Sequence, residues 1–278
     1  MTWINAVLRA VFDTVLGPVA GLPAMVGLSL AALACSIGML WIFKRTSNQD
    51  ALAEIKNQIH AGLFEIRLFN DDLPAIFRAQ AGILKANAKY LWHSLPPMLW
   101  IIVPIFFVVA QMQFHYGYEG LEPGDSALLT VRFQEEAELA KSEEKPAVTL
   151  DVPDGLAVET DAVWAPVLRE LTWRIGAEKP GDYLAMIGLD GAKIDKTVRV
   201  NDRLVRLSPT KVAKGILDQL IFPAEDPVVG ADSIESIDVS YADREISFFG
   251  WHTHWLVAFF AMTIVFAFLL RKPMGVTI

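Results

Sequence analysis

The sequence predicts a membrane α-helical protein with three transmembrane helices and a cytoplasmic helical hairpin, joined to an all-β, immunoglobulin-like sandwich domain outside the membrane. Three apolar blocks of 20 to 22 residues contain no Asp, Glu, Lys or Arg: residues 22–43, 91–112 and 251–270. Each block is long enough to cross a bilayer as a helix. A heptad pattern occupies the segment between the first two blocks, and short β-type segments occupy the segment between the last two.

Composition narrows the classes of function. Hydrophobic residues make up 53% of the 278 residues, and the net charge is −8, which argues against a protein that binds nucleic acid. The single cysteine, Cys35, lies inside the first apolar block. We therefore expect neither a disulfide framework nor a cysteine-rich metal site.

The basic residues predict the orientation in the membrane. Residues 44–90 begin with Lys44-Arg45 and carry seven basic and five acidic residues, and the tail 271–278 begins with Arg271-Lys272. The positive-inside rule places both segments in the cytoplasm. Residues 113–250, with 14 basic and 26 acidic residues, then lie outside. We expect a multi-pass protein of a bacterial inner membrane, with its N-terminus outside and its C-terminus in the cytoplasm.

Residues 1–21 predict an amphipathic helix at the membrane interface. Its polar side carries Asn5, Arg9 and Asp13, and the opposite stripe consists of Trp3, Val7, Leu8, Val11, Phe12, Val15 and Leu16. A helix packed on the membrane spans fits the same pattern. A cleaved signal peptide would need a basic region before the apolar block, where only Arg9 is present.

The cytoplasmic segment 44–90 carries a coiled-coil pattern. Apolar residues recur every seven positions, a second set follows three residues later, and Gly62 is the one gap: Leu52, Ile59, Ile66 and Leu73, then Ile55, Phe69, Ile76, Ile83 and Tyr90. Asn70 to Pro74 interrupt the pattern, because proline restricts the residue before it while aspartate caps a new helix. We expect two antiparallel helices, about 48–69 and about 74–90. A single kinked helix is the alternative.

The second apolar block, residues 91–112, contains Pro96, Pro97 and Pro104. A membrane helix tolerates proline where neighbouring groups satisfy the freed carbonyls. We therefore expect this helix to kink and to pack against another element.

Residues 113–250 predict a β-sandwich. Six short segments rich in β-branched or aromatic residues alternate with turn signals: 127–133, 147–152, 156–160, 171–175, 183–187 and 197–201. Tyr183 follows a turn and opens a strand, as the tyrosine-corner residue of immunoglobulin-like domains does. Trp173 is expected in the core of the facing sheet. Ser208-Pro209, followed by apolar residues up to Leu220, predicts one N-capped helix.

The sequence contains no convincing catalytic motif. His252 and His254 are spaced like two metal ligands on one strand face, but Trp251 and Trp255 flank them, so anchoring at the membrane interface is the expected role. P-loop, Rossmann, nucleophile-elbow and zinc signatures are absent. We predict a protein that is not an enzyme, with no catalytic residues, no cofactor and no metal.

The order of these parts resembles that of the YidC-type insertase superfamily. It is similar in particular to the three-span relatives, which include the insertase subunit of the endoplasmic-reticulum membrane complex and archaeal homologues. The resemblance rests on Lys44-Arg45, the seam 52–90, the proline-bearing second span, and the segments Arg78-Ala79-Gln80 and Ala86-Asn87. It covers about half of the chain, and the external sandwich is an addition to the core pattern.

The resemblance implies a groove, open to the cytoplasm and to lipid, in which polar side chains lower the cost of bringing a hydrophilic segment into hydrocarbon. The spans offer four groove candidates: Ser29, Ser36, Thr263 and Gln111. Four more stand at the cytoplasmic mouth: Arg78, Lys85, Lys89 and His93. Insertases of this superfamily often place a basic residue in the groove, whereas no span here contains Lys or Arg. An alternative interpretation of the mouth residues is that they are ordinary positive-inside flanks.

Two functions are therefore open. In the first, the chain is an insertase- or chaperone-like membrane protein that assists the insertion or assembly of other membrane proteins. In the second, it is a non-catalytic structural subunit of an inner-membrane complex, which binds partners through the hairpin and the sandwich. The expected partners are the lipid bilayer and either membrane-protein clients or stable complex subunits, with a homo-oligomer as a further option and no nucleic acid.

Overall fold

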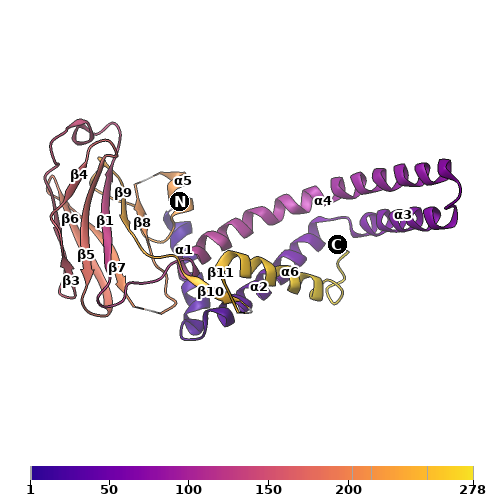
Figure 1. Cartoon of the computed structure of the whole chain (residues 1–278), viewed down its shortest axis with the longest axis horizontal. Coiled ribbons are helices and arrows are strands. Elements are labelled where there is room, and N and C mark those ends of the chain that lie inside the picture. The colour runs from indigo at the N-terminus through magenta and orange to yellow at the C-terminus, as the bar shows by residue number, and fades with distance from the viewer. Residues whose placement is uncertain (1, 202, 214, 249, 278) are drawn as a thin grey trace. The chain divides into compact units, whose positions relative to one another are not determined.

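The computed structural model describes residues 2–201, 203–213, 215–248 and 250–277, and the side chains of residues 2–4, 19 and 216 fall outside that description. The chain divides into two units, Met1–Gly27 with Val108–Trp255 and Leu28–Phe107 with Leu256–Ile278. The helices are α1 (Thr2–Leu16), α2 (Ala24–Thr46), α3 (Gln49–Leu68), α4 (Leu73–Tyr116), α5 (Ile216–Ile221) and α6 (Trp255–Leu270), with 3₁₀ turns at Gly17–Val19 and Glu138–Lys141 (Figure 1).

Two of these helices are long and apolar enough to cross a membrane. α2 contains 23 residues and α4 contains 44, so α4 is about 66 Å long at 1.5 Å per residue. The boundary expected between residues 90 and 91 falls inside α4, because the hairpin arm and the second apolar block form one continuous helix. Pro96, Pro97 and Pro104 all lie within it.

The third apolar block differs from the expectation. Trp251–His254 forms strand β11, and the helix α6 begins only at Trp255 and contains 16 residues. Its length is about 24 Å, which is less than the roughly 30 Å of a hydrocarbon core. The prediction of a 20-residue helix over 251–270 was therefore wrong at its start. Its first four residues pair with β10 as an antiparallel hairpin, in which Glu245 lies opposite His254.

The second unit contains two helices joined by a short turn, α3 and the first part of α4, which lie side by side (Figure 1). Asn48 caps α3, since its side chain accepts a hydrogen bond from the Ala51 N–H at 3.1 Å. Asp72 caps α4 in the same way, with the Ala75 N–H at 3.2 Å. Both caps agree with the sequence, which predicts helices on either side of the interruption at 70–74.

The shielded residues of α3 and α4 repeat at intervals of three and four. On α3 they are Leu52, Ile55, Ile59, Gly62 and Ile66, and on α4 they are Ile76, Ala79, Ile83, Ala86 and Tyr90. Phe69 and Leu73, which were expected in this seam, are instead exposed. Gly62 is required by packing, because a Cβ built there would lie 2.6 Å from the Ile83 Cγ1 atom.

The first unit contains two antiparallel sheets. Its strands are β1 (Ser126–Phe133), β2 (Val148–Asp151), β3 (Leu156–Val158), β4 (Val163–Ala165), β5 (Glu170–Ala177), β6 (Gly181–Leu189), β7 (Ala192–Val200), β8 (Thr210–Val212) and β9 (Ile234–Val239), followed by the separate hairpin of β10 (Glu245–Phe248) and β11 (Trp251–His254). One sheet has the order β3-β5-β1-β9-β8 with β4 on β5, and the other has the order β2-β6-β7. Residues of both sheets share one hydrophobic core.

The six predicted strand segments correspond to β1, β2, β3, β5, β6 and β7, although β7 begins at Ala192 rather than at 197. β4, β8, β9, β10 and β11 were not predicted. The helix expected after Ser208-Pro209 was wrong, since Thr210–Val212 is strand β8 and α5 starts after Gly215 without a side-chain cap. The strand order also differs from that of an immunoglobulin domain, where the first and second strands pair, whereas β1 lies between β5 and β9.

Two local predictions in the sandwich are confirmed. The Tyr183 hydroxyl donates a hydrogen bond to the backbone carbonyl of Lys179 at 2.9 Å, which is the contact made by a tyrosine corner. Trp173 on β5 belongs to the shared core, 5% exposed. The Asp190-Gly191 turn has φ values of 51° and 82°, as a two-residue hairpin turn between β6 and β7 requires.

The close contact at Gly62 leads to a prediction for the hairpin. Gly62→Val is expected to lower the local free energy of opening of α3 by about 1–3 kcal/mol, because the added atoms overlap Ile83. Gly82→Ala is the matched control, since a Cβ there meets nothing within 4 Å, and it should raise the helix stability by up to about 1 kcal/mol. Hydrogen exchange of α3 amides in the full chain measures both. Equal protection in the two variants would contradict the close packing of α3 on α4.

Candidate functional site

Three of the four groove candidates lie between α2 and α6 in the second unit. The Ser36 hydroxyl lies 2.7 Å from the carbonyl oxygen of Ala32 and 3.0 Å from that of Thr263, so it can donate to either. The Thr263 hydroxyl donates to the Phe259 carbonyl at 2.7 Å, and the Ser29 hydroxyl lies 3.2 Å from the Met262 sulfur. Ser36 and Thr263 are buried. These hydroxyls therefore serve the packing of α2 on α6.

The fourth groove candidate, Gln111, belongs to the first unit. It lies near the end of α4, where it is 1% exposed. Its side-chain oxygen has no hydrogen-bond partner in the part of the chain that the structure describes. Gln111 and the three candidates on α2 and α6 therefore belong to different units.

Three of the predicted mouth residues share one hollow on the hairpin. Arg78, Lys85 and Lys89 line a hollow of about 500 Å³ together with Gln58 and Glu65 of α3. His93 does not line it, and its Nδ1 atom lies 2.8 Å from the Lys89 carbonyl oxygen. The hollow is basic overall and lies along the shielded seam of the two helices.

The tip of the hairpin exposes a group of large apolar side chains, which we call the apolar tip. Their exposed fractions range from 46% to 75%, and the residues are Leu63, Phe64, Leu68, Phe69, Leu73 and Phe77. The sequence analysis did not single out this surface. The signal was available, because Leu63, Phe64, Leu68 and Phe77 fall outside the heptad positions and so cannot be covered by the partner arm.

In the first unit, α1 contacts the sandwich domain through its polar side. The Asn5 side chain donates to the Gln219 carbonyl at 2.7 Å, Arg9 pairs with Asp226, and Asp13 accepts a hydrogen bond from Arg206 at 2.8 Å. On the opposite stripe, Val7, Val11 and Val15 are exposed at 53%, 51% and 65%, while Leu16 is buried. The predicted division into a polar and an apolar face is therefore present, although the Trp3 side chain lies outside the described residues.

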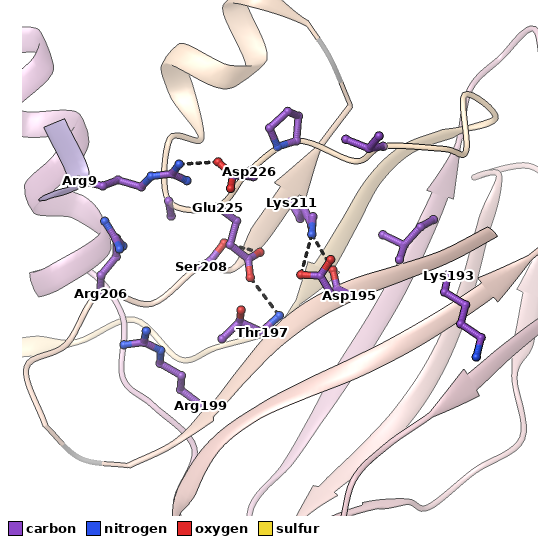
Figure 2. Close-up of a pocket in the computed structure, with 14 residues that line it drawn as sticks. Arg9, Lys193, Asp195, Thr197, Arg199, Arg206, Ser208, Lys211, Glu225 and Asp226 are labelled. Carbon is purple, nitrogen blue, oxygen red and sulfur yellow. Dashed lines mark hydrogen bonds and ion pairs between the residues drawn. The ribbon is translucent and has the colours of Figure 1, made fainter. Parts of the chain in front are cut away.

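The free edges of the two sheets are joined by two buried lysines. β7 and β8 each end their sheet. Lys211 on β8 donates to the carbonyl of Asp195 on β7 at 2.7 Å, and Lys196 on β7 donates to the carbonyl of Ser208, just before β8, at 2.6 Å. Figure 2 shows the contact between Lys211 and Asp195. Side chains here satisfy backbone groups that strand pairing leaves open.

Glu225 completes this link. Its carboxylate accepts hydrogen bonds from the Lys196 ammonium at 2.7 Å, the Thr197 backbone N–H at 3.0 Å and the Ser208 hydroxyl at 2.9 Å. Burial alone raises the pKa of Glu225, but the charge of Lys196 and the three hydrogen bonds outweigh burial, so the pKa lies below its ordinary value. The carboxylate is therefore ionised at neutral pH and balances the buried Lys196 charge.

Metal-ligating groups do not cluster in the described parts of the chain. No group of three or more His, Cys, Asp or Glu residues that could hold a metal ion occurs among them. His252 and His254 lie on β11, two residues apart on the same side of the strand. Comparison of the chain with protein-family models, with curated proteins and with solved structures finds no match.

The Lys196–Glu225 pair predicts a pH-dependent stability. Glu225→Gln should destabilise the folded chain by about 3–5 kcal/mol at pH 7, because Lys196, whose pKa burial already lowers, is left without its counter-charge. The stabilisation from ionised Glu225 is complete above the unfolded carboxyl pKa of about 4.3 and is lost as the pH falls through the lower pKa of the folded state. The difference in urea midpoint between wild type and variant should therefore shrink below about pH 4.3.

Glu143→Gln is the control for this measurement, since it removes one acidic charge from an exposed position and should leave the midpoint nearly unchanged. A gap between wild type and Glu225→Gln that stays constant from neutral to acid pH would show that the carboxylate does not stabilise the link between β7 and β8.

Proposed function

We propose that the chain is an insertase- or chaperone-like protein of a bacterial inner membrane, with its hairpin in the cytoplasm and its sandwich domain outside. The two long apolar helices α2 and α4 support a membrane location. The basic residues Lys44 and Arg45 at the end of α2, and Arg271 and Lys272 after α6, support the orientation.

The proposed topology includes α6 as a third crossing. α6 is about 24 Å long and lacks charged residues. A helix that is shorter than the hydrocarbon core is accommodated by local thinning of the bilayer and by flanking residues that reach toward the headgroups. Arg271 and Lys272 can do this on the cytoplasmic side, and Trp251 and His252 on β11 suit the opposite interface.

The apolar tip is the observation that carries the proposal. Soluble surfaces rarely expose several large apolar side chains together unless they bind something. α3 contains 20 residues, so the tip stands about 30 Å from the start of that helix. A site at this distance from the membrane suits capture of an apolar segment before it enters the bilayer. We therefore assign client binding to the tip.

The polar residues of the spans support a client-binding groove less strongly than the apolar tip supports client capture. The hydroxyls of Ser29, Ser36 and Thr263 lie at the contact between α2 and α6, where a client could reach them only if these helices separated. Arg78, Lys85 and Lys89 remain candidates for contact with acidic or backbone groups of a client, because they line the hollow along the hairpin. Capture by the hairpin is therefore the first step that the proposal requires.

One observation favours the second function, a structural subunit of a membrane complex. The turn between β4 and β5 exposes Val167 almost completely, at 95%, together with Leu168, and Val163 at the start of β4 is also exposed. An apolar turn at the end of a sheet is a suitable contact for a stable protein partner. A subunit of this kind would use the turn and the apolar tip as two separate docking surfaces.

Site-specific crosslinking distinguishes the two functions. A photo-crosslinker at Phe64, Leu68 or Phe77 should trap many newly made membrane proteins, and the adducts should disappear when translation is inhibited. Asn57 and Ala81, which are exposed on the same two helices, are the matched control positions and should trap few. The positions Ser29, Ser36 and Thr263 test the groove in the same cells.

A single adduct of constant mass from Phe64 and Val167, unaffected by translation, would instead support the structural subunit. Equal trapping at the tip and at the control positions would contradict client capture by the apolar tip.

A further inference from the structure

A pocket of about 550 Å³ lies in the first unit, beside the link between β7 and β8. It is lined by α1 through Arg9, by residues 193–195, 197 and 199 of β7, and by the segments around 206–211 and 224–229. Figure 2 shows that Arg9, Arg206 and Arg199 lie on one side of this pocket, while Lys193 lies on the other. The three arginines come from three separate parts of the chain.

The three guanidinium groups are close enough to influence one another. Burial lowers the pKa of Arg206, Asp13 raises it, and the neighbouring charges of Arg9 and Arg199 lower it further, so that the pKa lies below its ordinary value. Three like charges gathered at a partly buried site repel one another. An anion that enters this site would relieve the repulsion.

The guanidinium groups also have more donors than their protein partners use. Arg9 donates to Asp226 and Arg206 donates to Asp13, each through one N–H group, while the Arg199 Nε atom lies 3.7 Å from Asp182. The Arg206 Nη1 atom is buried and has no hydrogen-bond partner among the described residues. Each guanidinium carries five N–H donors, so most of the donors of these three groups have no acceptor among the described residues.

The acidic residues that line the pocket are already engaged. Asp195 pairs with Lys211 at 3.1 Å, Glu225 pairs with Lys196 at 2.7 Å, and Asp226 pairs with Arg9. Five basic residues line the pocket against these three acidic ones. The lining residues therefore carry more positive than negative charge, while Asp13 and Asp182, which do not line the pocket, pair with Arg206 and Arg199 beside it.

We propose that the pocket binds a phosphate group through Arg9, Arg199 and Arg206. Guanidinium groups match the paired oxygens of phosphate, and a tetrahedral anion offers acceptors to several of them at once. The group is carried either by the headgroup of an anionic phospholipid or by a soluble phosphate. The first source is within reach because α1, which supplies Arg9, is joined by residues 17–23 to α2, a candidate membrane span.

The test uses the full chain in detergent, with two probes. Binding of inorganic phosphate is measured by titration calorimetry at constant ionic strength, and retention of added phosphatidylglycerol is measured by native mass spectrometry with phosphatidylcholine as reference. Arg199→Gln is expected to weaken binding of the probe by about tenfold or more, because it removes a charged hydrogen-bond donor. Arg9→Gln is the second variant, and it should give a loss of similar size.

Lys145→Gln is the matched control. It removes one positive charge from an exposed position of the sandwich domain, and Lys145 does not line the pocket. Its binding should stay within about threefold of wild type, since an exposed charge outside the pocket is largely screened by salt.

The two probes identify the source of the phosphate. If wild type binds inorganic phosphate and the Arg199 and Arg9 variants do not, the ligand is a soluble phosphate. If wild type retains phosphatidylglycerol but does not bind inorganic phosphate, and the two variants lose the lipid, the ligand is a lipid headgroup. Either result supports the pocket. If wild type binds neither probe, or if Lys145→Gln and Arg199→Gln bind alike, the proposal is overturned.

Discussion

Hydrocarbon cannot hydrogen-bond to a polypeptide, and this constraint governs the part of the chain assigned to the membrane. Backbone groups there must pair within helices, and charged side chains must stay outside. α2 carries its only charges in its last turn, Lys44 and Arg45, and α6 carries none. The hydroxyls of Ser36 and Thr263 obey the same rule, because each lies within hydrogen-bond distance of a helix carbonyl. The hydroxyls of Ser36 and Thr263 thereby serve the packing of α2 on α6, and the surfaces proposed for partners lie instead on the hairpin and on the sandwich domain.

In the sandwich domain, charged side chains satisfy backbone groups that would otherwise lack a hydrogen-bond partner. The open edges of its two sheets expose backbone carbonyls, and Lys196 and Lys211 reach across to satisfy them. Burying a lysine is costly unless its charge is balanced, and Glu225 supplies that balance for Lys196. The same region gathers three arginines from α1, β7 and the segment before β8. The basic pocket lies beside the link between the two sheets, and α1 contributes Arg9 to it.

Much of the fold could be predicted because its signals are local. Apolar length marked α2 and the apolar part of α4, heptad spacing and the interruption at 70–74 marked the hairpin, and β-branched or aromatic segments between turn signals marked six strands. The failures have physical causes. β8 pairs with β9, and β9 pairs with β1, which is far away in sequence. Nothing near Ser208 in sequence reveals that its hydroxyl binds Glu225 rather than a helix end. Ser36 and Thr263 were recognised as polar residues of spans, but their contact depends on how α2 and α6 pack. The apolar tip was overlooked because Phe69 and Leu73 were assigned to the seam.

The central claim is that the hairpin and the sandwich domain lie on opposite sides of a membrane. Labelling of single cysteines tests it most directly, in a Cys35→Ser background with either Gln80→Cys on α4 or Val167→Cys on the β4–β5 turn, both exposed positions. A membrane-impermeant maleimide added to intact spheroplasts should label the Val167→Cys chain at once and the Gln80→Cys chain only after lysis. Labelling of both chains, or of neither, before lysis would contradict the account.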